Sequence, residues 1–319
     1  MIKRISVSLQ TMGVMDQDCV GLLSSNDIYY YALGDGAIAA GAVFAPIPTY
    51  VKQQELETSI SVALIRWLFV EPDFLDLVLS TTKEIGFPTS HIIVFDPPGK
   101  EPYSGPLESL SRLLSTSDKS LFVNANEGMD PKTRIAYRLF TSGTTGSVKA
   151  AELSHATQLA RLSNRQVAVK RATLRSLYMT GMYHGTGHRT VTHALAGRGP
   201  AVYVSKRLVE DKPHAIIDRI QSLGITSVLL PPRLLKRITD SIASGIRSRE
   251  SLQSLQTITL AGSFCPTDIP HKAREILPSQ IRMIVVYATT ETGGIASTEI
   301  SPAWVGGQVG RIVDQMEVR

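Results

Sequence analysis

The sequence has few cysteines, no long hydrophobic run and no dense cluster of one charge, and each absence excludes a class of protein. Cys19 and Cys265 lie too far apart to predict a disulfide framework and match no metal-site spacing. The longest apolar run, Ala37–Ile47, is too short to cross a bilayer. Lys and Arg number 33 against 28 Asp and Glu, and because the basic residues are dispersed, nucleic acid is not an expected partner. We therefore expect a cytosolic protein with reduced thiols and no membrane span.

The 319 residues are 43% hydrophobic and 19% charged, which is typical of a folded globular chain of about two domains. Short β-branched runs alternate with helical patterns, as in βαβ units. The polar stretch 115–132 predicts a linker, so we expect a first α/β subdomain over 1–130 and a second over 131–319. Strands are predicted at Val20–Leu23, Val43–Pro46, Trp67–Val70, Ile92–Phe95, Ile135–Phe140, Ser176–Met179, Ala201–Val204, Ser227–Leu230, Thr257–Ala261 and Met283–Val286. Helices are predicted at Ile28–Ala40, Asp73–Glu84, Pro213–Leu223, Pro232–Ser244 and Pro270–Ile276.

The most specific segment is Leu139–Lys149, which reads LFTSGTTGSVK. A strand-like lead-in opens into six small or hydroxyl residues, Thr141–Gly146, and Lys149 follows shortly after. Glycines let backbone N–H groups curl around an anion, hydroxyls add donors, and the lysine supplies positive charge. We therefore predict that this segment binds phosphate and is not merely an exposed Ser/Thr/Gly turn. It is not a Walker loop, because its glycines are too close together and no G-K-[ST] follows.

The segment Gly34–Ala39 formally matches the dinucleotide-binding fingerprint G-x-G-x-x-G/A. That fingerprint requires a strand immediately before the glycines, whereas residues 27–33 are Tyr-rich and helix-like. We therefore interpret these small residues as a helix-packing surface. The sequence also has no G-x-S-x-G elbow, so it carries no nucleophile signature of an α/β-hydrolase.

Three histidines, His184, His188 and His193, raise the question of a metal site. The first two are four residues apart, but Gly185 and Gly187 disfavour the helix that would place both on one face. Zinc is therefore not expected. The interpretation of His184 depends on the family that the other segments indicate.

The segment TSGTTG with Lys149 resembles the signature loop of the adenylate-forming superfamily, which includes acyl-CoA and aryl-CoA ligases such as 4-coumarate:CoA ligase. The resemblance implies an α/β fold of two stacked αβαβα-type subdomains, the N-terminal core of these enzymes, with the ligand site at the strand ends. It also implies residues before Met1 and a small C-terminal lid domain after Arg319. Further segments that resemble family motifs, in the same order, are Leu33–Pro48, Met182–Gly185, Val228–Pro232, Leu260–Cys265, Val286–Glu291 and Gly307–Arg311.

The resemblance implies that ATP, and AMP as its product, bind with Mg²⁺. The β- and γ-phosphates would be held by Thr141, Ser142, Gly143, Thr144, Thr145, Gly146 and Lys149. Tyr287 would stack on adenine, Thr290 would contact the α-phosphate and Glu291 would hold the metal. Gly262 and Ser263 would lie on the adenine side and, with His184 and Gly185, would line the acid pocket. The catalytic candidates are His184, Lys149 and Glu291.

The chain departs from the family pattern at three small positions. Val148 and Ala150 flank the lysine where the family has Pro and Gly, and Ala288 stands where it has Gly; alanine would be strained if that position needs a positive φ. The expected function is ATP-dependent activation of a carboxylic acid, followed by transfer to CoA or to a carrier protein. The alternatives are a core repurposed as a non-adenylating enzyme, with His184 as acid or base, and a pseudo-enzyme that binds a ligand or partner.

Overall fold

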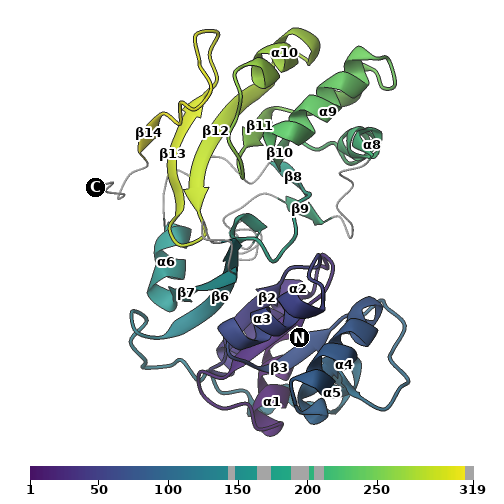
Figure 1. The fold of residues 1–319 in the computed structure, drawn as a ribbon, viewed down its shortest axis with the longest axis vertical. Helices are drawn as coiled ribbons and strands as arrows, with labels where there is room; N and C mark the ends of the chain where they lie inside the picture. The colour runs from purple at the N-terminus through teal and green to yellow at the C-terminus, as the bar shows by residue number, and fades with distance from the viewer. Residues whose placement is uncertain (143–147, 164–173, 188–200, 205–211, 313–319) are drawn as a thin grey trace. The chain divides into compact units, whose positions relative to one another are not determined.

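The computed structural model describes residues 1–142, 148–163, 174–187, 201–204 and 212–312. The chain forms two compact units: Met1–Arg161 with Gly181–Gly185, and Leu162–Thr180 with Thr186–Arg319. Within the described residues, each unit carries its own seven-stranded sheet (Figure 1). No helix in this part of the chain is both long enough and apolar enough to cross a membrane.

The first sheet has the strand order β5-β4-β3-β1-β2-β6-β7. All neighbours are parallel except β6 and β7, which form an antiparallel pair. The direction of winding reverses between β1 and β3, which makes this a doubly wound sheet with a topological switch point. The strands are β1 Cys19–Leu23, β2 Val43–Ile47, β3 Ile65–Val70, β4 Ile92–Val94, β5 Glu108–Ser109, β6 Ile135–Ser142 and β7 Val148–Ser154.

Helices of the first unit fall into two packed groups. Helix α1 contacts α2 and α5, while α3 contacts α4. Because crossovers between parallel strands are right-handed, this reversal of winding places the two groups on opposite faces of the sheet. The helices are α1 Ile2–Thr11, α2 Tyr30–Ala39, α3 Gln53–Val62, α4 Leu75–Glu84, α5 Leu110–Thr116 and α6 His155–Ser163, with short 3₁₀ turns η1 Pro72–Phe74, η2 Thr89–His91 and η3 Lys119–Leu121.

The small residues of α2 serve packing, as the sequence predicts. A Cβ atom at Gly34 would lie 2.9 Å from the Phe44 ring, and one at Gly36 would lie 2.5 Å from Cγ2 of Ile5. Gly34 therefore allows the close approach of strand β2, and Gly36 allows that of helix α1. Segment 34–39 lies inside this helix and does not follow a strand, so the dinucleotide interpretation is excluded by the structure.

The second sheet has the order β14-β13-β12-β11-β10-β8-β9, with β13 and β14 antiparallel to their neighbours and the rest parallel. Helices α8 and α9 begin with proline, which is preorganised for the first helical turn. The strands are β8 Arg175–Tyr178, β9 Ala201–Val204, β10 Ser227–Leu230, β11 Thr257–Leu260, β12 Arg282–Thr289, β13 Gly293–Glu299 and β14 Arg311–Ile312. The helices are α8 Pro213–Leu223, α9 Pro232–Ala243 and α10 Asp268–Ile276, with the 3₁₀ turn η6 Arg249–Leu252.

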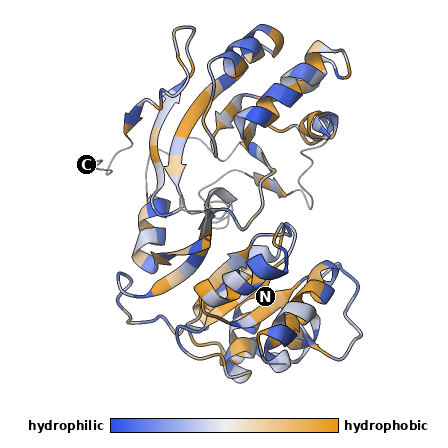
Figure 2. Cartoon of the chain, in the orientation of Figure 1, coloured by the Kyte–Doolittle hydropathy of each residue, from blue (hydrophilic) through white to orange (hydrophobic). Residues whose placement is uncertain are grey.

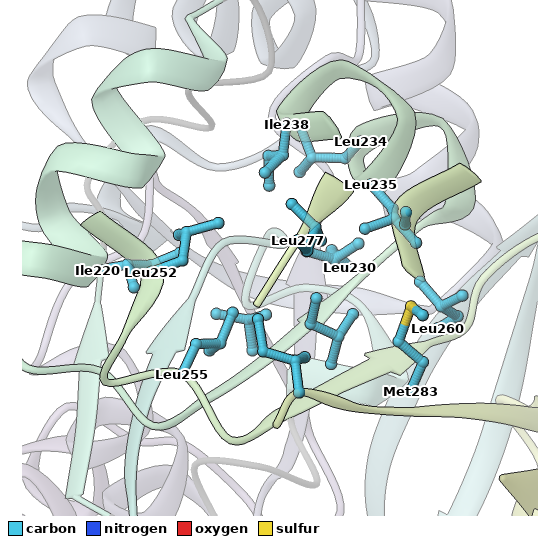
Figure 3. Packing of buried hydrophobic residues seen from close by; sticks show 14 of the residues in the cluster. Ile220, Leu230, Leu234, Leu235, Ile238, Leu252, Leu255, Leu260, Leu277 and Met283 are labelled. Carbon is cyan, nitrogen blue, oxygen red and sulfur yellow. The ribbon is translucent and has the colours of Figure 1, made fainter. Parts of the chain in front are cut away.

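Each unit has its own hydrophobic core. In the second unit, Leu234, Leu235 and Ile238 of α9 face Leu230 of β10 and Leu260 of β11 (Figure 3). Their spacing along α9 forms an apolar stripe, and the helix surfaces away from the strands are hydrophilic (Figure 2). In the first unit, β1 and β2 are buried throughout, as parallel strands covered on both faces are.

Both cysteines are buried and unpaired, in agreement with the prediction of structural thiols. Burial raises the pKa of Cys19 to about 12 and that of Cys265 to about 11. Each is therefore a protonated thiol at neutral pH.

The boundary between the two units lies further along the chain than the sequence predicts. Strand β6 pairs with β2 through Phe44 and Tyr137, and β7 pairs with β6, so both strands belong to the first unit. The expected boundary between 130 and 131 therefore falls inside this unit. The polar stretch 115–132 instead leads from the end of α5 to β6, which pairs with β2, and β7 then pairs with β6.

Candidate functional site

The predicted phosphate-binding segment lies at the tip of the β6–β7 hairpin. Thr141 is the pairing partner of Lys149, and Ser142 is that of Val148. Opposite residues of an antiparallel pair project to the same face, so the Thr141 hydroxyl and the exposed Lys149 side chain lie together at the base of the loop. Gly143, Thr144, Thr145 and Gly146 lie outside the described residues.

Side-chain contacts anchor this hairpin in the first sheet. The buried Tyr137 packs edge-on against Phe44, with ring centroids 6.2 Å apart, and its hydroxyl is hydrogen-bonded to Asp35. Arg138 on β6 pairs with Glu152 on β7 at 2.9 Å and donates to the Ala63 carbonyl at 3.0 Å. Strand β6, which leads into the loop, is therefore fixed by Tyr137 through Phe44 and Asp35 and by Arg138 through Glu152 and Ala63.

The hairpin opens at the carboxyl edge of the first sheet. Leu23 of β1 pairs with Ile47 of β2, and Phe44 of β2 pairs with Tyr137 of β6, so these three parallel strands end at the same edge. The residues that follow them, 24–26 and 48–50, therefore lie along the edge that carries Thr141. Ligands of doubly wound sheets bind beyond this edge.

His184 is presented by a turn that packs on the first unit. Its backbone N–H donates to the Gly181 carbonyl at 3.0 Å, and its ring lies 4.6 Å from the ring of the buried Tyr183. Tyr183 in turn packs edge-on against Tyr50, which follows β2. The His184 side chain is solvent-exposed, yet enough protein surrounds it that desolvation lowers the pKa of its imidazole. The lowered pKa favours the neutral form of the imidazole, and the partly buried Gly185 follows His184.

A buried carboxylate, Glu71, lies at the switch point of the sheet. It accepts hydrogen bonds from the Ser25 N–H at 2.8 Å and from Lys100 at 3.0 Å, and Lys100 also pairs with Asp27 at 3.3 Å. Burial alone would raise the pKa of Glu71, but these hydrogen bonds lower it below its usual value. The switch point is thus filled by a charged network that holds the residues on both sides of Asn26.

In the second unit, the predicted residues gather at the ends of β11 and β12. Leu260 pairs with Val285 in parallel register, so Gly262 and Tyr287 each lie two residues beyond this pair, at the same edge. Gly262 has φ +89°, and a side chain there would meet only open space. Ser263 is exposed, and the Tyr287 side chain is 49% exposed. An accessible aromatic ring beside a glycine can stack on a planar base.

Thr290 and Glu291 form the turn between β12 and β13, which is closed by the pairing of Thr289 with Gly293. Thr292 donates its backbone N–H to the Thr289 hydroxyl at 3.2 Å, which stabilises the turn. Glu291 is solvent-exposed, and an accessible carboxylate is the type of ligand that Mg²⁺ takes. Ala288 does not have a positive φ, so its substitution for glycine causes no backbone strain.

The structure brings the described site candidates together as two sets. Thr141, Lys149 and His184 belong to the first unit, and Gly262 and Ser263 lie with Tyr287 to Glu291 in the second. In the described ranges, no three His, Cys, Asp or Glu side chains form a metal-binding group, and His188 and His193 lie outside those ranges.

Two residues that bear on the site were missed by the sequence analysis. Asn26 and Tyr31 hydrogen-bond the backbone of Met182, two residues before His184. The available signal was that Asn26 follows a buried strand at its carboxyl end, where ligand-site residues gather.

The two α/β units and the hairpin loop are typical of a nucleotide-binding α/β protein. The chain belongs to the AMP-binding enzyme family, whose family model matches residues 1–319. The resemblance to adenylate-forming enzymes is thereby confirmed.

Curated relatives and solved structures agree with this assignment. The chain is 26% identical to phenylacetyl-CoA ligase epaB and also 26% identical to acyl-CoA ligase azaF, both of Aspergillus niger. It is covered completely in both comparisons and spans 59% and 60% of their lengths. The anthranilate CoA ligase AuaEII in complex with anthranoyl-AMP has the same fold, with a TM-score of 0.80 at 20% identity over 98% of this chain and 58% of that one.

Proposed function

We propose that this chain carries the acid- and nucleotide-binding residues of an ATP-dependent acid–thiol ligase. In the first half-reaction, a carboxylate oxygen attacks the α-phosphorus of ATP, the bond to the bridging oxygen breaks, and acyl-AMP and pyrophosphate form. In the second, a thiol of CoA or of a carrier protein attacks the acyl carbonyl and AMP leaves. The observation that carries the proposal is the pairing of Thr141 with Lys149, which closes the TSGTTG loop.

In this proposal the first unit holds the phosphates and the acid. Thr141 and Lys149, with the backbone of the loop between them, stabilise the charge that accumulates on the departing pyrophosphate. The neutral, exposed His184 lies beside the acid and accepts or donates a hydrogen bond without adding charge.

The second unit contributes the residues for the base and the metal. Tyr287 stacks on adenine, and Gly262 and Ser263 let the base approach the strand ends. Thr290 contacts the α-phosphate, and the accessible carboxylate of Glu291 would hold Mg²⁺. When bound, the metal offsets phosphate charge.

The proposal is tested by exchange of labelled pyrophosphate into ATP with a panel of acids that includes phenylacetate, 4-coumarate, anthranilate and hexanoate. We expect exchange with at least one acid. Lys149→Ala lowers the rate by about a hundredfold, because loss of one preorganised charge-stabilising group has an effect of this size. Glu291→Gln lowers it by a comparable factor and raises the magnesium concentration needed for half the maximal rate.

Matched controls separate these effects from a general change of charge. Lys132→Ala removes an exposed positive charge from the first unit, as Lys149→Ala does, and Glu275→Gln removes an exposed negative charge from the second unit, as Glu291→Gln does. Both controls are expected to leave pyrophosphate exchange unchanged. Exchange with no acid on intact protein, while ATP still binds, would reject adenylation in favour of a ligand-binding role. Addition of CoA to the acid, ATP and Mg²⁺ tests the second half-reaction through thioester formation.

A further inference from the structure

Five residues, Gly181–Gly185, pack with the first unit although the chain before and after them belongs to the second. This segment ends with His184 and Gly185, two of the residues assigned to the acid. Its placement therefore decides where the imidazole lies with respect to the rest of the first unit.

Two buried side chains grip the backbone of this segment at one residue. The Met182 N–H donates to Oδ1 of Asn26 at 2.7 Å, and the Tyr31 hydroxyl donates to the Met182 carbonyl at 2.6 Å. Asn26 is 7% exposed and Tyr31 is 1% exposed, so water does not compete for these bonds. Both the donor and the acceptor of one peptide residue are thus held by residues more than 150 positions earlier in the chain.

The turn itself has little freedom once Met182 is held. The His184 N–H bonds back to Gly181, and a Cβ at Gly181 would lie only 2.1 Å from the Tyr183 ring. Only glycine therefore permits this close approach. The Tyr183 ring is also fixed by Tyr50, which leaves His184 as the exposed side chain of the turn.

Asn26 is itself positioned from both sides. Glu71 accepts from the N–H of Ser25, the residue before it, and Lys100 pairs with Asp27, the residue after it. Because Glu71 and Lys100 also pair with each other, one charged network holds the residues on both sides of Asn26.

We propose that Asn26 and Tyr31 are positioning residues that hold the Gly181–His184 turn on the first unit and thereby set the affinity for the carboxylic acid. The inference rests on the proposed function, in which His184 contacts the acid. It adds that the switch point of the first sheet acts on the acid through the Met182 backbone.

The kinetic test uses variants that each remove one bond of this clamp. Tyr31→Phe keeps the ring and is expected to raise KM for the acid about fivefold, and Asn26→Ala is expected to raise it about tenfold. In both variants KM for ATP should stay within about twofold of the wild-type value. Asn26→Asp keeps an oxygen acceptor for the Met182 N–H and is expected to restore most of the affinity. Tyr30→Phe removes the hydroxyl of the neighbouring buried tyrosine and serves as the matched control.

Hydrogen exchange followed by mass spectrometry supplies a readout that does not depend on activity. In Asn26→Ala and Tyr31→Phe, exchange in peptides covering 181–185 is expected to rise at least fivefold, while peptides of β1 and β2 keep their protection. Unchanged exchange at 181–185, or an equal rise of both KM values, would overturn the inference. If the wild-type protein shows no pyrophosphate exchange, the proposed function fails. Hydrogen exchange in peptides covering 181–185 then decides by itself whether Asn26 and Tyr31 hold this turn.

Discussion

Asp35 places a carboxylate within helix α2, whose other residues are mostly apolar or small. Burial raises its pKa from 3.8 to about 6, and the hydrogen bond from Tyr137 offsets only part of that effect. Burial, together with the contact with Asp35, raises the pKa of Tyr137 well above its usual value. At neutral pH the first unit therefore contains a partly desolvated negative charge that reduces its stability.

Asp35→Asn is expected to stabilise the first unit at pH 7.5 but not at pH 4. A carboxyl with a raised folded-state pKa favours the folded state below its unfolded pKa, near 3.8, and this contribution is lost as pH rises through about 6. Between pH 4 and pH 7.5 the free energy of unfolding of the wild type therefore falls by about 2–3 kcal/mol through this group, and Asp35→Asn does not show this loss. Urea unfolding followed by pulsed hydrogen exchange of β1 peptides measures the difference. Glu57→Gln, which removes an exposed carboxylate from α3, should show no such pH dependence, and a constant difference for Asp35→Asn would contradict the expectation.

At the scale of elements, local pattern predicts most helices and strands. Helix α8 and strands β9 and β10 have the predicted bounds, because β-branched runs and amphipathic periodicity are properties of neighbouring residues. Helices α3, α5 and α6 and strands β5, β7, β13 and β14 were not predicted. Strands β7 and β13 contain few buried residues, and they adopt the extended conformation by pairing with β6 and β12.

Gly36→Ala is expected to destabilise the first unit by about 1–2 kcal/mol, because overpacking against Ile5 outweighs the gain in helix propensity. Urea unfolding of the single variants Gly36→Ala and Ile5→Ala and of the double variant measures the coupling. The double variant should be less destabilised than the sum, since Ile5→Ala removes the Cγ2 atom that a Cβ at Gly36 would meet at 2.5 Å, although the Cβ of residue 5, at 2.6 Å, remains. Strict additivity would mean that the close approach to Cγ2 is not what requires the glycine.

At the scale of the whole molecule, the two hydrophobic cores share no residue. The cluster in the second unit runs from Leu177 to Trp304, and the cluster in the first lies among residues 19–107. Each sheet with its helices therefore has the buried surface of an independent domain.

Leu235→Ala removes a fully buried side chain of α9 and is expected to cost the second unit about 2–5 kcal/mol. Hydrogen exchange should rise in peptides of β10–β12 and stay unchanged in peptides of β1–β3. Lys236→Ala, on the exposed side of the same helix, serves as the control and should change stability by less than about 1 kcal/mol. An equal loss of protection in both sheets would show that the units unfold together.

The sequence alone determined the αβ alternation, the packing role of Gly34 and Gly36, the position of the TSGTTG segment and the family, because each depends on residues close together in the chain. Tertiary structure alone decided that β6 and β7 complete the first sheet. It also decided that Asn26 and Tyr31 hold Met182, and that burial raises the pKa of Asp35 to about 6. These features depend on contacts between segments far apart in the chain and on burial, and neither leaves a periodic trace in the residues that take part.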